Sequence, residues 1–491
     1  MRSLQTDSMN QNRSFRQILR STAIFGGSSV INVLVGMVRV KLIAIMLGPV
    51  GVGLVGMYSM IMSTATGIAG LGMNYSGVRQ VAAAQAANDE QAISDIWKAL
   101  IKASIVFGIL VMLGMCIMAQ AISMSIFKDV SHAFAIRVLS VGTLFGVIAG
   151  TQTALLSGLR RVGDLARINV VGAILGTMIS VLMIVVWGSK SIPYFIVTGV
   201  ILTLLVSHLL IRKLSCPKLS SSLGQQWQQL KPMLRLGILN MLASQAIAGI
   251  AMIAARSIII HYLGEDANGY FQAAYGISSI YISFILSSMS TDFYPRLTGV
   301  IHDRKAMNEL IDQQLEMSII IAMPIMLCLI TFAPWILTLL YSSKFMSATV
   351  MLRWQLVGEL LKLLSFPMKF IILSLGCGGL FFIVESAWCL IYLPLIFGGV
   401  IVNGIAATGF AYALTCLASF LSLIIISKRI AGFHWHRRSL HLVVISLCMV
   451  ISLCCILHVN EISGVIAGTI SATVFGLYSL RRLHGISKLS F

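Results

Sequence analysis

The chain has 491 residues, of which 58% are hydrophobic and 10% are charged, and its mean hydropathy is +0.93. A water-soluble protein of this composition would expose extensive apolar surface, so the composition excludes that class and indicates a polytopic membrane protein. The formal net charge is +19, from 35 Lys and Arg against 16 Asp and Glu. These basic residues are spread over short loops on one predicted side of the membrane, which argues against nucleic acid as a partner.

Long apolar segments recur along the whole chain. About fourteen are predicted to be membrane-spanning helices, because they are too long and too apolar for the strands of a membrane barrel. The fold class is therefore predicted to be all-α, with about 14 transmembrane helices in two six-helix pseudo-repeats around a central cavity, plus two C-terminal helices. The predicted centres lie near residues 33, 62, 110, 145, 176, 202, 247, 281, 327, 362, 390, 416, 449 and 471.

The order of apolar and polar segments predicts five parts. The chain has no cleavable signal peptide in this interpretation, because its polar, basic start leads into an apolar run of full spanning length. The predicted parts are a cytoplasmic N-terminal segment (1–20), a first six-helix bundle (21–212), a cytoplasmic linker (213–232), a second six-helix bundle (233–427) and two extra C-terminal helices (428–491). Most Lys and Arg lie on the side of the termini, so the positive-inside rule places both termini in the cytoplasm.

Two stretches indicate an internal repeat, because both contain a Leu-Gly pair followed by a later glycine. Each follows a long apolar segment with a single arginine, Arg39 or Arg256. An internal repeat with an ionisable residue in each membrane segment is typical of transporters whose two bundles face a shared cavity. The stretches are Leu47-Gly48-Pro49-Val50-Gly51-Val52-Gly53 and Leu263-Gly264-Glu265-Asp266-Ala267-Asn268-Gly269.

The two repeated arginines are the first candidates for substrate binding. Arg39 and Arg256 lie some 10 to 12 Å from the outer ends of their segments, at about 1.5 Å per residue. A lone cation at that depth is expensive on a lipid-facing surface, so a water-filled cavity is expected around both. Lys41 is either a third cavity cation or a side chain that snorkels to the outer surface. At matching places after the next apolar segments, Arg79 and Arg296 are expected to form a cytoplasmic gate.

The later segments add further charges. Glu359 and Lys362 are three residues apart and share a helix face, so they form either a structural ion pair or a pair that faces the cavity, with Lys362 as a substrate-binding cation. Glu385 is either a proton or sodium coupling site or a partner for Lys369. Cationic groups outnumber acidic ones within the predicted spans. A cavity of that sign suits an anionic substrate such as a phosphate or pyrophosphate.

Cofactor and metal motifs give no support for an enzyme. Residues 51–56 match GxGxxG but lack a βαβ unit and are expected in an outer loop, and no GxxxxGK[ST] stretch occurs. The stretch His434-Trp435-His436 looks faintly metal-binding, but a cytoplasmic anchor loop explains it better. No metal, no cofactor and no catalytic residue are therefore expected.

The whole pattern resembles a known family of transporters. Fourteen spans in two repeats, with Gly-rich first and second spans, are similar to the multidrug/oligosaccharidyl-lipid/polysaccharide exporter superfamily. Within it, the motifs resemble the Wzx-type O-antigen and enterobacterial common antigen flippases. These motifs are Leu42-Ile43-Ala44 through Gly53, Gly70-Leu71-Gly72 and Val78-Arg79-Gln80-Val81-Ala82.

The resemblance implies a flippase rather than an enzyme. It would move undecaprenyl-pyrophosphate-linked oligosaccharide repeat units across the bacterial inner membrane, with cavity cations from the first and seventh spans. O-antigen polymerase and a chain-length regulator are implied as partners. The alternatives are a cation-coupled multidrug exporter of the same fold, which requires a deep carboxylate, a flippase for peptidoglycan precursors, and a membrane glycan polymerase, which requires a large periplasmic loop.

Overall fold

The structure, a computed structural model, describes residues 2–213, 238, 241–242 and 246–489. The described residues form helices and no strand, as the sequence predicted for an all-α membrane protein. Except for Lys213, the predicted linker 213–232 lies outside this part of the chain. The chain divides into two compact units, Met1–Ile253 and Ala254–Phe491, so the unit boundary falls inside α9 (Ile247–Leu263).

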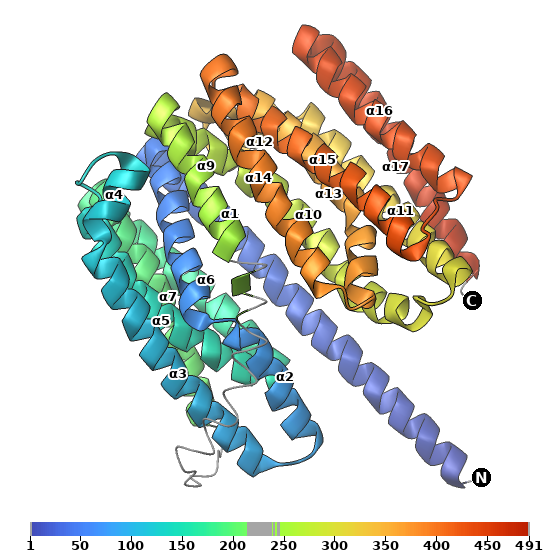
Figure 1. Cartoon of the computed structure of the whole chain (residues 1–491), viewed down its shortest axis with the longest axis horizontal. Helices are drawn as coiled ribbons and strands as arrows, with labels where there is room; N and C mark the ends of the chain where they lie inside the picture. The colour runs from blue at the N-terminus through green and yellow to red at the C-terminus, as the bar shows by residue number, and fades with distance from the viewer. Residues whose placement is uncertain (1, 214–237, 239–240, 243–245, 490–491) are drawn as a thin grey trace. The chain divides into compact units, whose positions relative to one another are not determined.

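The first unit is a helical bundle in which α5 is the central helix. It packs against α1, α2, α3 and α7, while α6 packs against α1 and α7 (Figure 1). The helices of this unit are α1 (Arg2–Gly70), α2 (Met73–Ala86), α3 (Glu90–Ile117), α4 (Ala119–Phe127), α5 (Ala133–Gly158), α6 (Val162–Trp187), η1 (Gly188–Ser191) and α7 (Ile192–Arg212).

The second unit is built around α13. This helix packs against α10, α11, α14, α15 and α16, and α16 and α17 pack together against α11. Its helices are α10 (Glu265–Val300), α11 (Arg304–Thr331), α12 (Ala333–Leu340), η3 (Ser343–Ala348), α13 (Thr349–Ser374), α14 (Gly378–Asn403), α15 (Ala406–Ala431), α16 (Arg437–Val459) and α17 (Glu461–Leu489).

The predicted span centres all fall on helices, although the spans are not all separate elements. Among the described residues, nine stretches are long and apolar enough to cross a membrane. Two of them, Gly27–Gly70 and Val162–Arg212, have 44 and 51 residues, so each is long enough for two of the predicted spans. The shorter α9 has 17 residues. Four charged side chains interrupt the apolar character of α13, the segment predicted near residue 362: Arg353, Glu359, Lys362 and Lys369.

Residues 51–56 do not lie in an outer loop, contrary to the expectation. Gly48 alone breaks the helix, with φ 66° and ψ −164°, and the chain is helical again from Pro49. Proline suits the first turn of a helix because its fixed φ is helical and its missing N–H would have no partner there. The Gly-rich stretch is therefore the start of a long helix.

Backbone turns recur at a constant spacing in the two units. Gly48 and Gly264 both have positive φ, and 264 − 48 = 216. The same difference separates Gly188 from Gly404, which have φ values of 57° and 61°. Positive φ is the conformation that glycine adopts without strain, and it ends a helix sharply. The two units thus reverse the chain direction at corresponding positions.

Candidate functional site

Arg256 is the most deeply buried cation of the second unit. Its residue exposure is 1%, and its Nη2 donates a hydrogen bond to Oε1 of Gln272 on α10. Its Cζ lies 5.3 Å from the ring centroid of Phe271 and 5.9 Å from that of Tyr275. The two rings are stacked, with an interplanar angle of 8°. The guanidinium therefore lies against aromatic faces, where a cation–π attraction is available.

Most of the hydrogen-bonding capacity of Arg256 is unused. Its Nε and Nη1 are buried, and neither has a hydrogen-bond partner among the described protein groups. Arginine stays protonated in proteins, and a buried charge without a counter-ion costs several kcal/mol. One amide oxygen and two rings do not neutralise it. The chemistry of this pocket therefore matches an anion that carries several oxygen acceptors.

The α9–α10 hairpin brings Arg256 and Gln272 together. Arg256 comes eight residues before Gly264 and Gln272 comes eight residues after it. Gly264 has φ 87° and separates the two helices. In an antiparallel helical hairpin, residues at equal distances from the turn lie at equal depth, here roughly 12 Å from Gly264. The position of the turn therefore determines the partner of Arg256.

A second polar group surrounds Glu359 at the centre of α13. The carboxylate of Glu359 is 1% exposed, and Oε1 accepts a 2.6 Å hydrogen bond from the hydroxyl of Tyr412 on α15. The Nζ of Lys362 lies 3.3 Å from Oε2 of Glu359, and the Lys362 side chain is 40% exposed. The buried carboxylate is thus neutralised by an ammonium group that remains accessible.

A third group joins α13 to α14. The Nζ of Lys369 donates to Oε1 of Glu385 at 2.5 Å, and both side chains are about 30% exposed or less. Both predicted coupling carboxylates therefore have a lysine partner, as the ion-pair alternatives proposed. The two pairs belong to one cavity of about 110 Å³, which is lined by Lys362, Ser365, Lys369, Val384, Glu385, Trp388, Tyr412, Cys416 and Ser419.

The remaining predicted site residues divide between the units. Arg39 is half-buried on α1, with its Cζ 5.6 Å from the ring centroid of Phe195 on α7, and Lys41 is also half-buried. Arg79 on α2 and Arg296 on α10 are exposed. Arg39, Lys41 and Arg79 belong to the first unit, and the other predicted residues belong to the second. A cavity shared by Arg39 and Arg256, and a gate of Arg79 and Arg296, stay predictions.

The sequence interpretation missed several partners of the predicted charges. Tyr412 and Trp388 carried no motif, because aromatic residues are common in apolar helices. Gln272 and Tyr275 could have been found, since both follow Gly264 at spacings that return them to the depth of Arg256. Among the described residues, no group of three or more His, Cys, Asp or Glu is placed to hold a metal ion.

Comparison with known structures identifies the fold. An inward-facing multidrug resistance MATE-family transporter of the MOP superfamily is 17% identical, with a TM-score of 0.67, covering 81% of this chain and 95% of that one. The lipid II flippase MurJ in an inward closed conformation is 15% identical, with a TM-score of 0.67, covering 94% and 99%. A MOP transporter from Pyrococcus furiosus, described as having a binding pocket of reverse polarity, is 18% identical, with a TM-score of 0.57, covering 83% and 94%. The chain thus has the fold of MOP-superfamily transporters.

Sequence comparison gives the family. The lipid III flippases of Escherichia coli (strain K12) and Shigella flexneri are each 22% identical to this chain over 361 residues, which cover 71% of this chain and 83% of each relative. The family model described as "Polysaccharide biosynthesis protein" matches residues 42–350, more than half of the chain. The chain is a member of this polysaccharide biosynthesis protein family.

Proposed function

We propose that this protein is a flippase for lipid-linked oligosaccharides. Its substrate is an undecaprenyl-pyrophosphate-linked repeat unit of the O-antigen type, moved from the cytoplasmic to the periplasmic leaflet of the bacterial inner membrane. The family match, the lipid III flippases among its relatives and the MOP fold support this proposal. These relatives are flippases and transporters, so the protein acts on its substrate without a chemical reaction.

The buried guanidinium of Arg256 is the observation that carries the proposal. Its Nε and Nη1 lack partners among the described residues, and a diphosphate offers several oxygen acceptors in the geometry that guanidinium groups bind. Arg39 in the first unit, Lys41 and Lys362 supply further positive charge in the proposed mechanism. We assign the pyrophosphate to these cations because sugars and polyprenyl chains without charged substituents have no need of them.

Alternating access accounts for movement of the polar head group. Moving an oligosaccharide through hydrocarbon is prohibitive, because each polar group without a hydrogen bond costs several kcal/mol. In the proposed cycle, the six-helix bundles 21–212 and 233–427 open to one side at a time. The sugars pass through water between them while the polyprenyl chain stays in lipid. Arg79 and Arg296 close the cytoplasmic side, where both termini lie, and O-antigen polymerase and a chain-length regulator act on the product.

The ion pairs weigh against the cation-coupled drug exporter. That function requires a deep carboxylate whose charge is free to bind a proton or a metal cation. Glu359 has Lys362 and Tyr412 as partners, and Glu385 has Lys369. In both places a lysine ammonium already supplies the positive charge that a coupling cation would bring.

A deletion strain tests the proposed function. Lipid-linked oligosaccharides and surface glycan are measured together, and we expect surface glycan to be lost while single repeat units accumulate on the cytoplasmic leaflet. Unpolymerised single units at the cell surface would indicate a polymerase instead. Normal surface glycan with raised drug sensitivity would indicate the drug exporter.

Alanine variants test the assigned cations in the same strain. We expect Arg256→Ala and Arg39→Ala to cripple export while abundance in the membrane stays near normal. Arg161→Ala is a matched control, because Arg161 forms an exposed ion pair with Asp164, 3.5 Å apart, on the surface of the first unit. Wild-type export by both Arg256→Ala and Arg39→Ala would refute the assignment.

A further inference from the structure

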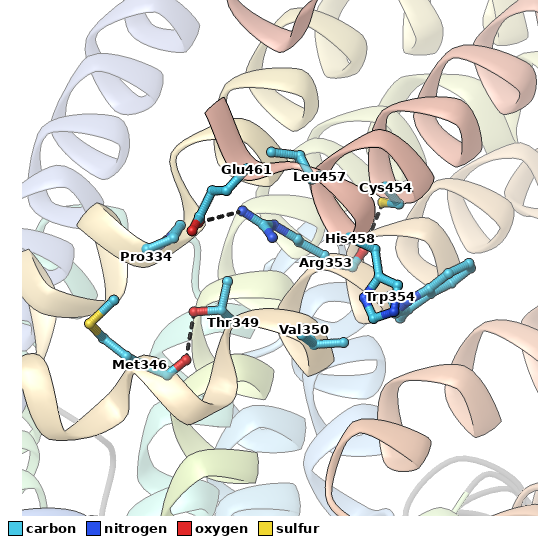
Figure 2. Close-up of a pocket in the computed structure, with 10 residues that line it drawn as sticks. All are labelled: Pro334, Met346, Thr349, Val350, Arg353, Trp354, Cys454, Leu457, His458 and Glu461. Carbon is cyan, nitrogen blue, oxygen red and sulfur yellow. Dashed lines mark hydrogen bonds and ion pairs between the residues drawn. The ribbon is translucent and has the colours of Figure 1, made fainter. Parts of the chain in front are cut away.

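A second polar cavity lies near the first turn of α13, apart from the groups assigned to the oligosaccharide. It has a volume of about 290 Å³, which corresponds to roughly ten water molecules. Figure 2 shows the ten residues that line it, contributed by α12, η3, α13, α16 and α17. They are Pro334, Met346, Thr349, Val350, Arg353, Trp354, Cys454, Leu457, His458 and Glu461. All of them belong to the second unit.

Charges of both signs face one another in this cavity. The side chain of Arg353 is 7% exposed and that of Glu461 is 57% exposed, and their Nη2 and Oε1 atoms lie 3.4 Å apart (Figure 2). A single contact of this length with a solvent-exposed carboxylate contributes little to stability. His458 adds a third titratable group, and Trp354 adds an aromatic ring. The lining thus has a place for an anion and a place for a cation.

The structural roles of the two charged residues leave room for a ligand. The Nε of Arg353 donates at 3.2 Å to the carbonyl of Ile330, which lies in the last turn of α11, so Arg353 is held in place without Glu461. The N-terminus of α17 is capped by Asn460, whose Oδ1 accepts from the backbone N–H of Ile462 at 3.0 Å. Glu461 is therefore not needed as the cap of that helix.

The surroundings of the cavity are apolar and exposed. Met346, which lines it, is 52% exposed, and Val459 and Ile462, next to its charged residues, are 87% and 75% exposed. In a membrane protein such side chains face lipid acyl chains. Arg353 lies about 6 Å from the start of α13, and the neighbouring Trp335 is 54% exposed, as is typical of the head-group level.

We propose that this cavity binds the head group of a zwitterionic phospholipid that carries a primary amine. The phosphate pairs with Arg353 and His458, and the ammonium group pairs with Glu461 beside the ring of Trp354. The acyl chains then lie along the apolar surface beside the cavity. A purely anionic head group would face the Glu461 carboxylate, and a quaternary amine has no N–H to donate to it. In the predicted orientation the bound lipid belongs to the outer leaflet, and it joins α13 to α16 and α17.

Native mass spectrometry of the full-length protein with added lipids tests this site. We expect one phosphatidylethanolamine to be retained about tenfold more strongly than phosphatidylcholine or phosphatidylglycerol, because one charge-assisted hydrogen bond is at stake. Glu461→Gln should abolish this preference. Glu265→Gln is the matched control, because Glu265 is also an exposed glutamate at the first position of a helix in the same unit, and its preference should equal that of the wild type.

The comparison among lipids uses the wild-type protein, so it does not depend on whether a variant folds. Equal retention of the three lipids would show non-specific annular lipid and overturn the proposal. A preference for phosphatidylglycerol, or an undiminished preference in Glu461→Gln, would also overturn it. Because no oligosaccharide enters this experiment, its result is independent of the proposed flippase function.

Discussion

The hydroxyl of Tyr412 donates a 2.6 Å hydrogen bond to Oε1 of Glu359, and both side chains are buried. Tyr412 also packs directly on α13, because a Cβ at Gly358 would lie only 2.5 Å from its ring. One glycine therefore permits α15 to approach α13 closely enough for the hydrogen bond to form. Buried polar groups in membrane helices require such partners.

Removal of the Tyr412 hydroxyl should destabilise the second unit. Tyr412→Phe leaves a buried carboxylate oxygen without its donor, at a cost of about 1 to 3 kcal/mol. Tyr392→Phe is the matched control, because the buried hydroxyl of Tyr392 has no hydrogen-bond partner among the described residues. We expect a lower thermal unfolding midpoint in detergent for Tyr412→Phe only. Equal shifts for the two variants would show that the hydrogen bond does not matter.

The Glu359–Lys362 pair should respond asymmetrically to mutation. Lys362→Met leaves a buried carboxylate without its cation, which costs about 3 to 5 kcal/mol where no other group compensates. Glu359→Gln leaves Lys362 able to reach solvent, since its side chain is 40% exposed, so the loss should be smaller. The double variant should recover most of the stability lost by Lys362→Met. A double-mutant cycle on unfolding midpoints measures the coupling, and additive effects would contradict it.

A carboxylate in place of Gln272 should act as an internal competitor of the substrate. Gln272 is already hydrogen-bonded to Arg256, so Gln272→Glu would place a counter-ion on the buried guanidinium. The protein should become more stable and export less oligosaccharide, because substrate must displace the new ion pair. Gln272→Met removes the hydrogen bond without adding charge and serves as the control. Wild-type export by Gln272→Glu would count against substrate binding at Arg256.

Two GxxxG pairs in the sequence should differ in their sensitivity to alanine. A Cβ at Gly468 on α17 would overlap the side chain of Thr331 on α11, whereas a Cβ at Gly176 on α6 meets no atom within 4 Å in this structure. Gly468→Ala should therefore loosen the packing of α17 and lower the unfolding midpoint. Gly176→Ala should leave it unchanged or slightly raised, since alanine favours helix. An equal response of both variants would contradict this packing.

The turns made part of the site predictable. Arg256 and Gln272 lie eight residues on either side of Gly264, and Lys369 and Glu385 lie eight residues on either side of Cys377, which follows the positive-φ Gly376. In each hairpin, residues at equal distances from the turn meet at one depth. The partner of Lys369 was accordingly among the alternatives that the sequence offered. The Glu359–Tyr412 contact was not predictable, because 53 residues and two turns separate the partners.

The sequence by itself determined that the protein is an all-α membrane protein with an internal repeat and buried cations. Hydropathy and helical length are local properties, and the cost of unsatisfied backbone groups in lipid leaves helices as the only choice for apolar segments of this length. Only the tertiary structure decided that Arg256 is left without a counter-ion while Glu359 and Glu385 each have a lysine. Pairing depends on which helix faces meet, and that is a property of packing between helices rather than of any one segment.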